Sequence, residues 1–163
     1  MASADLNRSM AEGAQTQDHE QVRSTLEQLI RLNYDGVGAY EMAAKLLKND
    51  HYIEICHDFV GQRRHFVDEL APMLIRYGGT PPDSQSFNSL MNDVWMNIQS
   101  LVSGDDGAIV TECDRGNELA VDLYYQAQGE DLPEDVKTLV QSQFSLLKGE
   151  HERIHRLADA LQQ

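Results

Sequence analysis

Apolar residues recur three or four positions apart along most of the chain, and this spacing limits the possible fold more than any other feature of the sequence. It is the spacing that puts apolar side chains on one buried face of an α-helix. No segment shows the period-two alternation that a half-buried β-strand requires. The sequence therefore predicts an all-α protein.

The same spacing, together with residues that end helices, predicts four long helices and one shorter helix. Asn49 and Asp50 interrupt the first helix, and Asp50 can cap the second, which stops before a Gly-Gly pair and two prolines. Asp106 can cap the fourth helix, and Pro133 is well placed in the first turn of the last. The predicted ranges are about 19–47, 50–77, 87–102, 106–128 and 133–161.

Short turns join the first helix to the second and the fourth to the last, so each pair is predicted to form an antiparallel hairpin. About 30 residues connect the two hairpins, and the short helix lies in this crossover. One long crossover between two hairpins is the connectivity of ferritin-like bundles. We therefore expect a ferritin-like four-helix bundle with a short fifth helix. Trp95 is expected on the buried side of that helix, on the face of Met91, Val94, Ile98 and Val102.

The N-terminal segment differs in composition from the rest of the chain. Residues 1–18 are rich in Ala, Ser, Gln, Gly and acidic residues and lack apolar periodicity. Such a segment cannot bury enough apolar surface to offset the entropy lost on ordering. We predict a disordered tail over residues 1–18 and one helical domain over residues 19–163. Ser24 and Glu27, at capping-box spacing, give an alternative start for the first helix.

The charge of the chain bears on its partners. Thirteen basic and 27 acidic residues give a formal net charge of −14. This charge opposes binding to nucleic acid phosphates and to anionic lipid, and it disfavours a DNA-protecting relative of ferritin. No window approaches the roughly 18 apolar residues of a membrane span, and no secretory signal is present at the N-terminus. We expect a cytoplasmic protein that binds neither nucleic acid nor membranes.

Two cysteines, Cys56 and Cys113, fall on apolar helix stripes without C-x-x-C spacing. This arrangement indicates neither a disulfide framework nor a zinc knuckle. Free cysteine is commonly buried, so we interpret both thiols as inert packing groups.

Polar residues interrupt the apolar faces at a regular spacing. Asn33 and Tyr40 lie seven residues apart on the core-facing line of the first helix, and Asn117 and Tyr124 repeat this spacing on the fourth. Buried polar groups need hydrogen-bond partners. We predict a network of side chains that satisfy one another and fix the helix register, formed by Asn33, Tyr40, Gln62, Asn117, Tyr124 and His151.

The spacing also resembles that of a di-iron site. Ferritin-like proteins supply such a site with one Glu from each of two helices and a Glu-x-x-His pair from each of the other two. Here Asn33, Asn117 and Gln62 are amides where that pattern has carboxylates, and neutral amides do not offset the charge of two iron ions. The alternative interpretation is an iron or manganese site that uses other residues: His65, Glu118, His151, Glu152 and His155.

Two further patterns are interpreted as surface features, although the first could instead mark the register of the metal ligands. Glu27 and Tyr34 have the same spacing as Asn33 and Tyr40, but lie about 120° round the helix from that line, which is typical of a half-exposed flank. Glu112, Asp114, Glu118 and Asp122 alternate along the fourth helix, which is typical of a solvated acidic surface because residues two apart do not share a helix face.

The chain also resembles a bacterial ferritin-like four-helix-bundle family known as domain of unknown function 2383. The resemblance covers about residues 20–161 and rests on the order and spacing of short motifs. These are Leu29-Ile30, Tyr34-Asp35-Gly36, Tyr40, Ala43-Ala44, Gln62-Arg63, Phe66, Glu69-Leu70, Gly78-Gly79, Pro81, Trp95, Glu112-Cys113, Arg115-Gly116, Tyr124, Leu132-Pro133 and His151. The family has no established activity, so the resemblance implies the fold and only a loose association with bacterial stress responses.

These observations favour a non-catalytic bundle that acts as a structural or interaction protein in a small homo-oligomer, with no cofactor. The alternative is a metal-binding oxidoreductase or an iron-handling protein that uses iron or manganese. No phosphate-binding glycine loop and no G-x-S-x-G nucleophile motif points to another chemistry.

Overall fold

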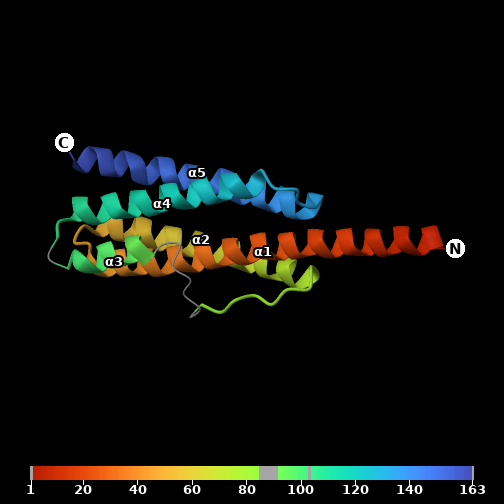
Figure 1. The fold of residues 1–163 in the computed structure, drawn as a ribbon. Helices are drawn as coiled ribbons and strands as arrows, with labels where there is room; N and C mark the ends of the chain where they lie inside the picture. The colour runs from red at the N-terminus through yellow and green to blue at the C-terminus, as the bar shows by residue number, and fades with distance from the viewer. Residues whose placement is uncertain (1, 85–91, 103, 163) are drawn as a thin grey trace.

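A computed structural model of the chain describes residues 2–84, 92–102 and 104–162, and within these ranges the protein is all-α, as predicted (Figure 1). Apolar spacing of three and four produces long helices because it gives each one a continuous buried face. The helices are α1 (Ala2–Leu46), α2 (Asp50–Arg76), α3 (Asn92–Ser100), α4 (Asp106–Gln128) and α5 (Glu134–Leu161).

The four long helices pack as two antiparallel hairpins, α1 with α2 and α4 with α5, which confirms the predicted pairing (Figure 1). The hairpins meet through α1 against α4 and α2 against α5. Among the residues described, no Cα atom of α2 comes within 8 Å of α4, so these two helices lie diagonally across the bundle. The short helix α3 contacts α1 and α4 near the α1–α2 turn.

The core of the bundle is apolar towards both ends of the helices and polar about halfway along them. Fully buried side chains from every long helix fill it, and burying each contributes about 1.5–3 kcal/mol. They include Leu26, Ile30, Phe66, Leu70, Leu74, Ile109, Val136, Val140 and Leu147. Between them lie buried polar and charged residues, which form the site described below.

Helix α1 begins at Ala2, whereas the sequence predicted a disordered tail through Asp18. Its first turns extend beyond the other helices, and residues 2–13 are all exposed (Figure 1). Ala, Met, Glu and Gln favour helix, and extending a helix that is already nucleated costs little. The structure therefore differs from the prediction, although no apolar side chain of residues 2–13 is buried.

Both predicted helix caps were wrong by one residue. Asn49 caps α2, since its Oδ1 accepts the His51 N–H at 2.9 Å, and Asp105 caps α4 by accepting the Ala108 N–H at 2.8 Å. Asp106 instead accepts the backbone N–H groups of Lys48 and Asn49 at 3.0 and 2.9 Å. It thus ties the start of α4 to the α1–α2 turn, a role that depends on tertiary packing. Likewise Pro133 immediately precedes α5 and does not lie in its first turn.

The crossover is only partly described. The start of the predicted helix, with Phe87, Leu90 and Met91, lies outside the described residues, and α3 covers the remainder to Ser100. Val94 and Ile98 are buried and Trp95 is partly buried, its ring lying over Gly38. Val102 is 74% exposed, so it was wrongly assigned to the buried face. The helix ends before it, and the chain turns away.

Candidate functional site

The guanidinium of Arg63 lies at the centre of the bundle and joins all four long helices. Its side chain is 1% exposed, and Nη2 donates to Glu150 Oε1 on α5 at 3.0 Å and to Asn117 Oδ1 on α4 at 2.7 Å. Nη1 donates a longer hydrogen bond to Asn33 Oδ1 on α1, at 3.5 Å. Three acceptors from three helices therefore surround one cation from α2.

Tyrosine and amide side chains extend this arrangement through further hydrogen bonds. Tyr40 donates to Glu150 Oε1 at 3.0 Å. Asn33 Nδ2 donates to the Tyr124 hydroxyl at 2.8 Å, and that hydroxyl donates to Gln143 Oε1 at 2.7 Å. We call the connected set the core polar network. It consists of Asn33, Tyr40, Arg63, Asn117, Tyr124, Gln143 and Glu150.

Gln143 connects the network to its outer edge. Its Nε2 donates to the backbone carbonyl of Phe66 at 3.2 Å and to Glu69 Oε1 at 3.3 Å. Glu69 is partly buried on α2, and it lies 3.6 Å from the exposed His65. The network therefore runs from the buried ion pair to a carboxylate near the surface.

The local sequence explains how these groups meet. Residues seven apart lie on nearly the same line of a helix, and α5 repeats the spacing of α1 and α4 with Gln143 and Glu150. Gly36 makes room for the guanidinium, because a Cβ there would come within 3.3 Å of Arg63 Nη1. A side chain at position 36 would press on the cation.

The ionisation of the network is set by burial and by the ion pair. Burial disfavours the charge of Arg63, but the charge and hydrogen bond of Glu150, together with Tyr40 and Tyr124, outweigh this effect, so the pKa of Arg63 is raised. Burial and then the charge of Glu150 raise the pKa of Tyr40 well above its ordinary value. Burial also raises the pKa of Tyr124. Both phenols therefore stay protonated and can donate hydrogen bonds.

Four of the six residues predicted to form a network lie in it: Asn33, Tyr40, Asn117 and Tyr124. Gln62 is only partly buried, and its buried Oε1 has no hydrogen-bond partner. His151 is partly buried and faces Asp114 on α4 at 3.7 Å. The structure thus places both residues outside the network, since Arg63 and Glu150 are the residues that face the core on those two helices.

The residues predicted as alternative metal ligands do not come together. His65, Glu118, Glu152 and His155 are exposed, and His65 lies on α2 beside Glu69. His151 and His155 are close to each other on α5, with ring centroids 5.7 Å apart. In the described part of the chain, no three His, Cys, Asp or Glu side chains are arranged to hold a metal ion.

The core polar network does not fit a di-iron site. Its one carboxylate, Glu150, is already paired with Arg63, and its other oxygen donors are amides and protonated phenols. Two iron ions would add at least four positive charges beside a guanidinium that stays charged. This donor set holds an internal cation and not a metal cluster.

Cys56 and Cys113 are both buried, on α2 and α4. A hydrogen bond with Cys56, and then burial, raise the pKa of the Cys113 thiol. A disulfide usually requires Cα atoms within about 7 Å, whereas each described Cα atom of α2 lies more than 8 Å from every described Cα atom of α4. The arrangement agrees with inert packing groups.

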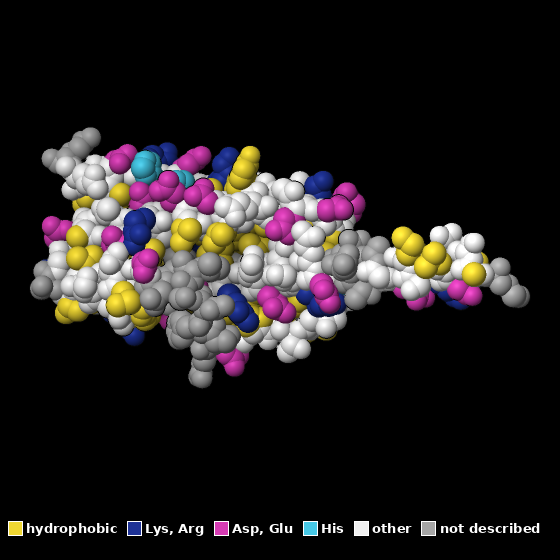
Figure 2. All heavy atoms as spheres, in the orientation of Figure 1, with side chains coloured by type: hydrophobic (Ala, Val, Ile, Leu, Met, Phe, Trp, Pro, Cys, Tyr) yellow, Lys and Arg dark blue, Asp and Glu magenta, His cyan; other side chains and the backbone are white. Residues whose placement is uncertain are grey.

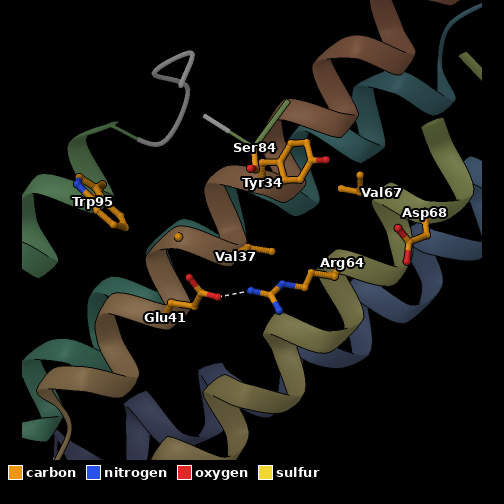
Figure 3. A pocket seen from close by; sticks show the side chains of 9 residues that line it. Tyr34, Val37, Glu41, Arg64, Val67, Asp68, Ser84 and Trp95 are labelled. Atoms are coloured by element: carbon orange, nitrogen blue, oxygen red, sulfur yellow. Dashed lines mark hydrogen bonds and ion pairs between the residues drawn. The ribbon is translucent and has the colours of Figure 1, made fainter. Parts of the chain in front are cut away.

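A cleft of about 600 Å³ opens between α1, α2 and α3 (Figure 3). An exposed ion pair between Glu41 on α1 and Arg64 on α2 lines it. Tyr34 and Trp95 line opposite sides of it. The cleft lies outside the core polar network and includes none of the predicted site residues.

Comparison with known proteins supports the fold. Residues 21–130 match the sequence profile described as Domain of unknown function (DUF2383). No curated protein matches the chain. A similar solved structure is that of a conserved hypothetical protein, rv2844, from Mycobacterium tuberculosis, with a TM-score of 0.67 and 14% sequence identity over 82% of this chain and 94% of that one. At this identity the likeness shows the fold alone. None of the described helices is both long enough and apolar enough to span a membrane.

Proposed function

The chain belongs to the DUF2383 family, and we propose that it is a non-catalytic, ferritin-like bundle protein whose core polar network stands in place of a di-iron site. The ferritin-like assignment is supported by two antiparallel hairpins and one crossover that carries a short helix. The protein then acts through its surfaces, as a structural or interaction protein.

The observation that carries this proposal is the ion pair between Arg63 and Glu150. Each side chain is 1% exposed, and their closest atoms are 3.0 Å apart. A buried ion pair adds little net stability compared with apolar packing, but it fixes which groups must face one another. In this bundle a protein cation therefore supplies the central positive charge that metal ions supply in di-iron proteins.

Without a metal ion to fix them, the four helices need another way to keep their register. A four-helix core of similar apolar residues can slide by a turn, whereas a network that contacts all four helices is satisfied in one register only.

Exposed apolar side chains, including Tyr125 at 69% and Leu146 at 51%, support the accompanying proposal of a small homo-oligomer.

Metal analysis tests the proposal. The protein is expressed with added iron and purified without chelators, and the iron per chain is measured by mass spectrometry alongside the near-ultraviolet absorption spectrum. We expect far less than one iron per chain and no oxo-bridge band. A ratio near two with such a band would show that the core holds a di-iron site and that the proposal is wrong.

A light-scattering measurement of mass during size-exclusion chromatography tests the oligomer. A dimer or trimer is expected. A monomer at all concentrations would contradict that part of the proposal while leaving the metal result unaffected.

A further inference from the structure

The cleft between α1, α2 and α3 has the size of a small-molecule site (Figure 3). Its volume of about 600 Å³ lies within the range of about 300–1,000 Å³ that is usual for ligand pockets. Such pockets combine apolar and aromatic walls with a few polar groups that orient the ligand. The residues that line this cleft supply both kinds of surface.

The apolar part of the lining consists of two valines and two aromatic rings. Val37 on α1 and Val67 on α2 are buried and give the cleft an apolar inner surface. Tyr34 on α1 and Trp95 on α3 are partly buried and lie on opposite sides of it (Figure 3). Aromatic rings pack well against hydrocarbon groups, and the faces of Trp and Tyr also attract cations. This part of the lining therefore suits a ligand with an apolar group and a positive charge.

Gly38 keeps the indole of Trp95 close to α1. A Cβ atom at position 38 would lie 3.1 Å from Cζ3 of Trp95, closer than the roughly 3.5–4.0 Å at which carbon atoms pack best. The glycine therefore allows the ring to pack against the helix at the side of the cleft.

The polar part of the lining carries two carboxylates and one guanidinium, so its net charge is negative. Arg64 is paired with Glu41, and these two charges offset each other (Figure 3). Arg64 also lies four residues before Asp68 on α2, a spacing that permits an ion pair, but its guanidinium is directed at Glu41 instead. Among the residues described, none forms a hydrogen bond or an ion pair with Asp68. Asp68 therefore supplies the net charge of the lining.

We propose that this cleft binds a small organic ammonium ion that carries an aromatic or alkyl group. The ammonium group binds beside the Asp68 carboxylate, and the hydrocarbon part contacts Tyr34 and Trp95. The net charge of −14 on the whole chain also attracts a cation. An anion would instead have to displace Glu41 from Arg64 and would be repelled by Asp68.

The cleft contains none of the residues of the core polar network, so this inference goes beyond the proposed function and does not depend on it. Binding of an amine here leaves the Arg63–Glu150 ion pair in place. The iron content of the core and amine binding in the cleft can therefore succeed or fail independently.

Three probes that share a phenylethyl skeleton test the charge of the ligand. They are phenethylamine, which is protonated at pH 7, its neutral counterpart 2-phenylethanol, and the anion 3-phenylpropionate. Each is titrated into the full chain at constant ionic strength, and the emission of Trp95, the only tryptophan, is measured. We expect saturable binding of phenethylamine, at least about fivefold tighter than that of 2-phenylethanol. The anion should bind most weakly.

Variants of the lining locate the bound amine. Asp68→Asn should weaken phenethylamine binding at least about threefold and leave that of 2-phenylethanol unchanged. Tyr34→Ala should weaken both, because it removes a ring that both probes contact. Asp58→Asn is the matched control, since it removes the same charge from an exposed position of α2 outside the cleft. It should bind phenethylamine as the wild type does.

Circular dichroism of each variant checks that the helices are intact. The proposal is overturned if phenethylamine shows no saturable binding, or if 2-phenylethanol or 3-phenylpropionate binds as tightly. It is also overturned if folded Asp68→Asn or Tyr34→Ala binds phenethylamine as the wild type does, or if Asp58→Asn weakens binding as much as Asp68→Asn.

Discussion

Removing the charge of Arg63 is the most direct test of the core polar network. In Arg63→Met the apolar volume is largely kept, but Glu150 loses its cation and Asn117 loses its donor at 2.7 Å. Both partners are buried, with Glu150 at 4% and Asn117 at 1% exposure. Breaking a buried ion pair from one side costs about 3–5 kcal/mol, since it leaves a charge without compensation.

This magnitude is large compared with the stability of a domain. Total unfolding free energies are about 5–15 kcal/mol, and each kcal/mol shifts the melting temperature by about 2–4 °C in a chain of this length. We therefore expect Arg63→Met to melt roughly 6–20 °C below the wild type. The double variant Arg63→Met/Glu150→Gln removes both charges and should recover a large part of this loss.

Urea denaturation of the wild type, the two single variants and the double variant gives the coupling free energy of the pair. The exposed ion pair between Arg64 and Glu41 is the matched control, and Arg64→Met should cost no more than about 1 kcal/mol. Our reasoning is refuted if Arg63→Met costs no more than Arg64→Met, or if the single effects simply add in the double variant. Either result would mean that the pair is solvated in solution.

Three further predictions concern single residues of the core and its border. Asn33→Leu should lower the unfolding free energy by about 1–3 kcal/mol, partly offset by apolar burial, because the Tyr124 hydroxyl loses its donor; denaturation that shows a clear gain would contradict this. Burial raises the pKa of Asp35 from 3.8 to about 6, against the opposing charge of Arg31, so its contribution to stability falls as pH rises through this range. Asp35→Asn should therefore gain stability over the wild type between pH 4 and 7, by about 1 kcal/mol once screening at this half-buried site is included, and pH-dependent melting checks it. Gly61→Ala, where no atom would contact the new Cβ, should stabilise by about 0.5–1 kcal/mol, whereas Gly36→Ala should show no such gain because its Cβ presses on the guanidinium; equal gains at the two sites would show that position 36 is not tight.

The sequence by itself determined the helices and their pairing. Helix formation depends on spacing of three and four and on local stop signals, so it can be followed along the chain without knowing the partners. The same spacing placed Asn33, Tyr40, Asn117 and Tyr124 on core-facing lines. It also implied that these polar groups must meet one another, because buried polar atoms need partners.

Only the tertiary structure decided which other residues complete the network. Gln62 and Arg63 are adjacent, about 100° apart on the helix, and an arginine is seldom fully buried, so the sequence favoured the amide. On α5 the Gln143 and Glu150 pair has the same spacing of seven, but both residues look like ordinary surface positions until the neighbouring helices enclose them. Burial of a charge is favourable only beside its counter-charge, and the counter-charge of Glu150 comes from a residue 87 positions away in the chain.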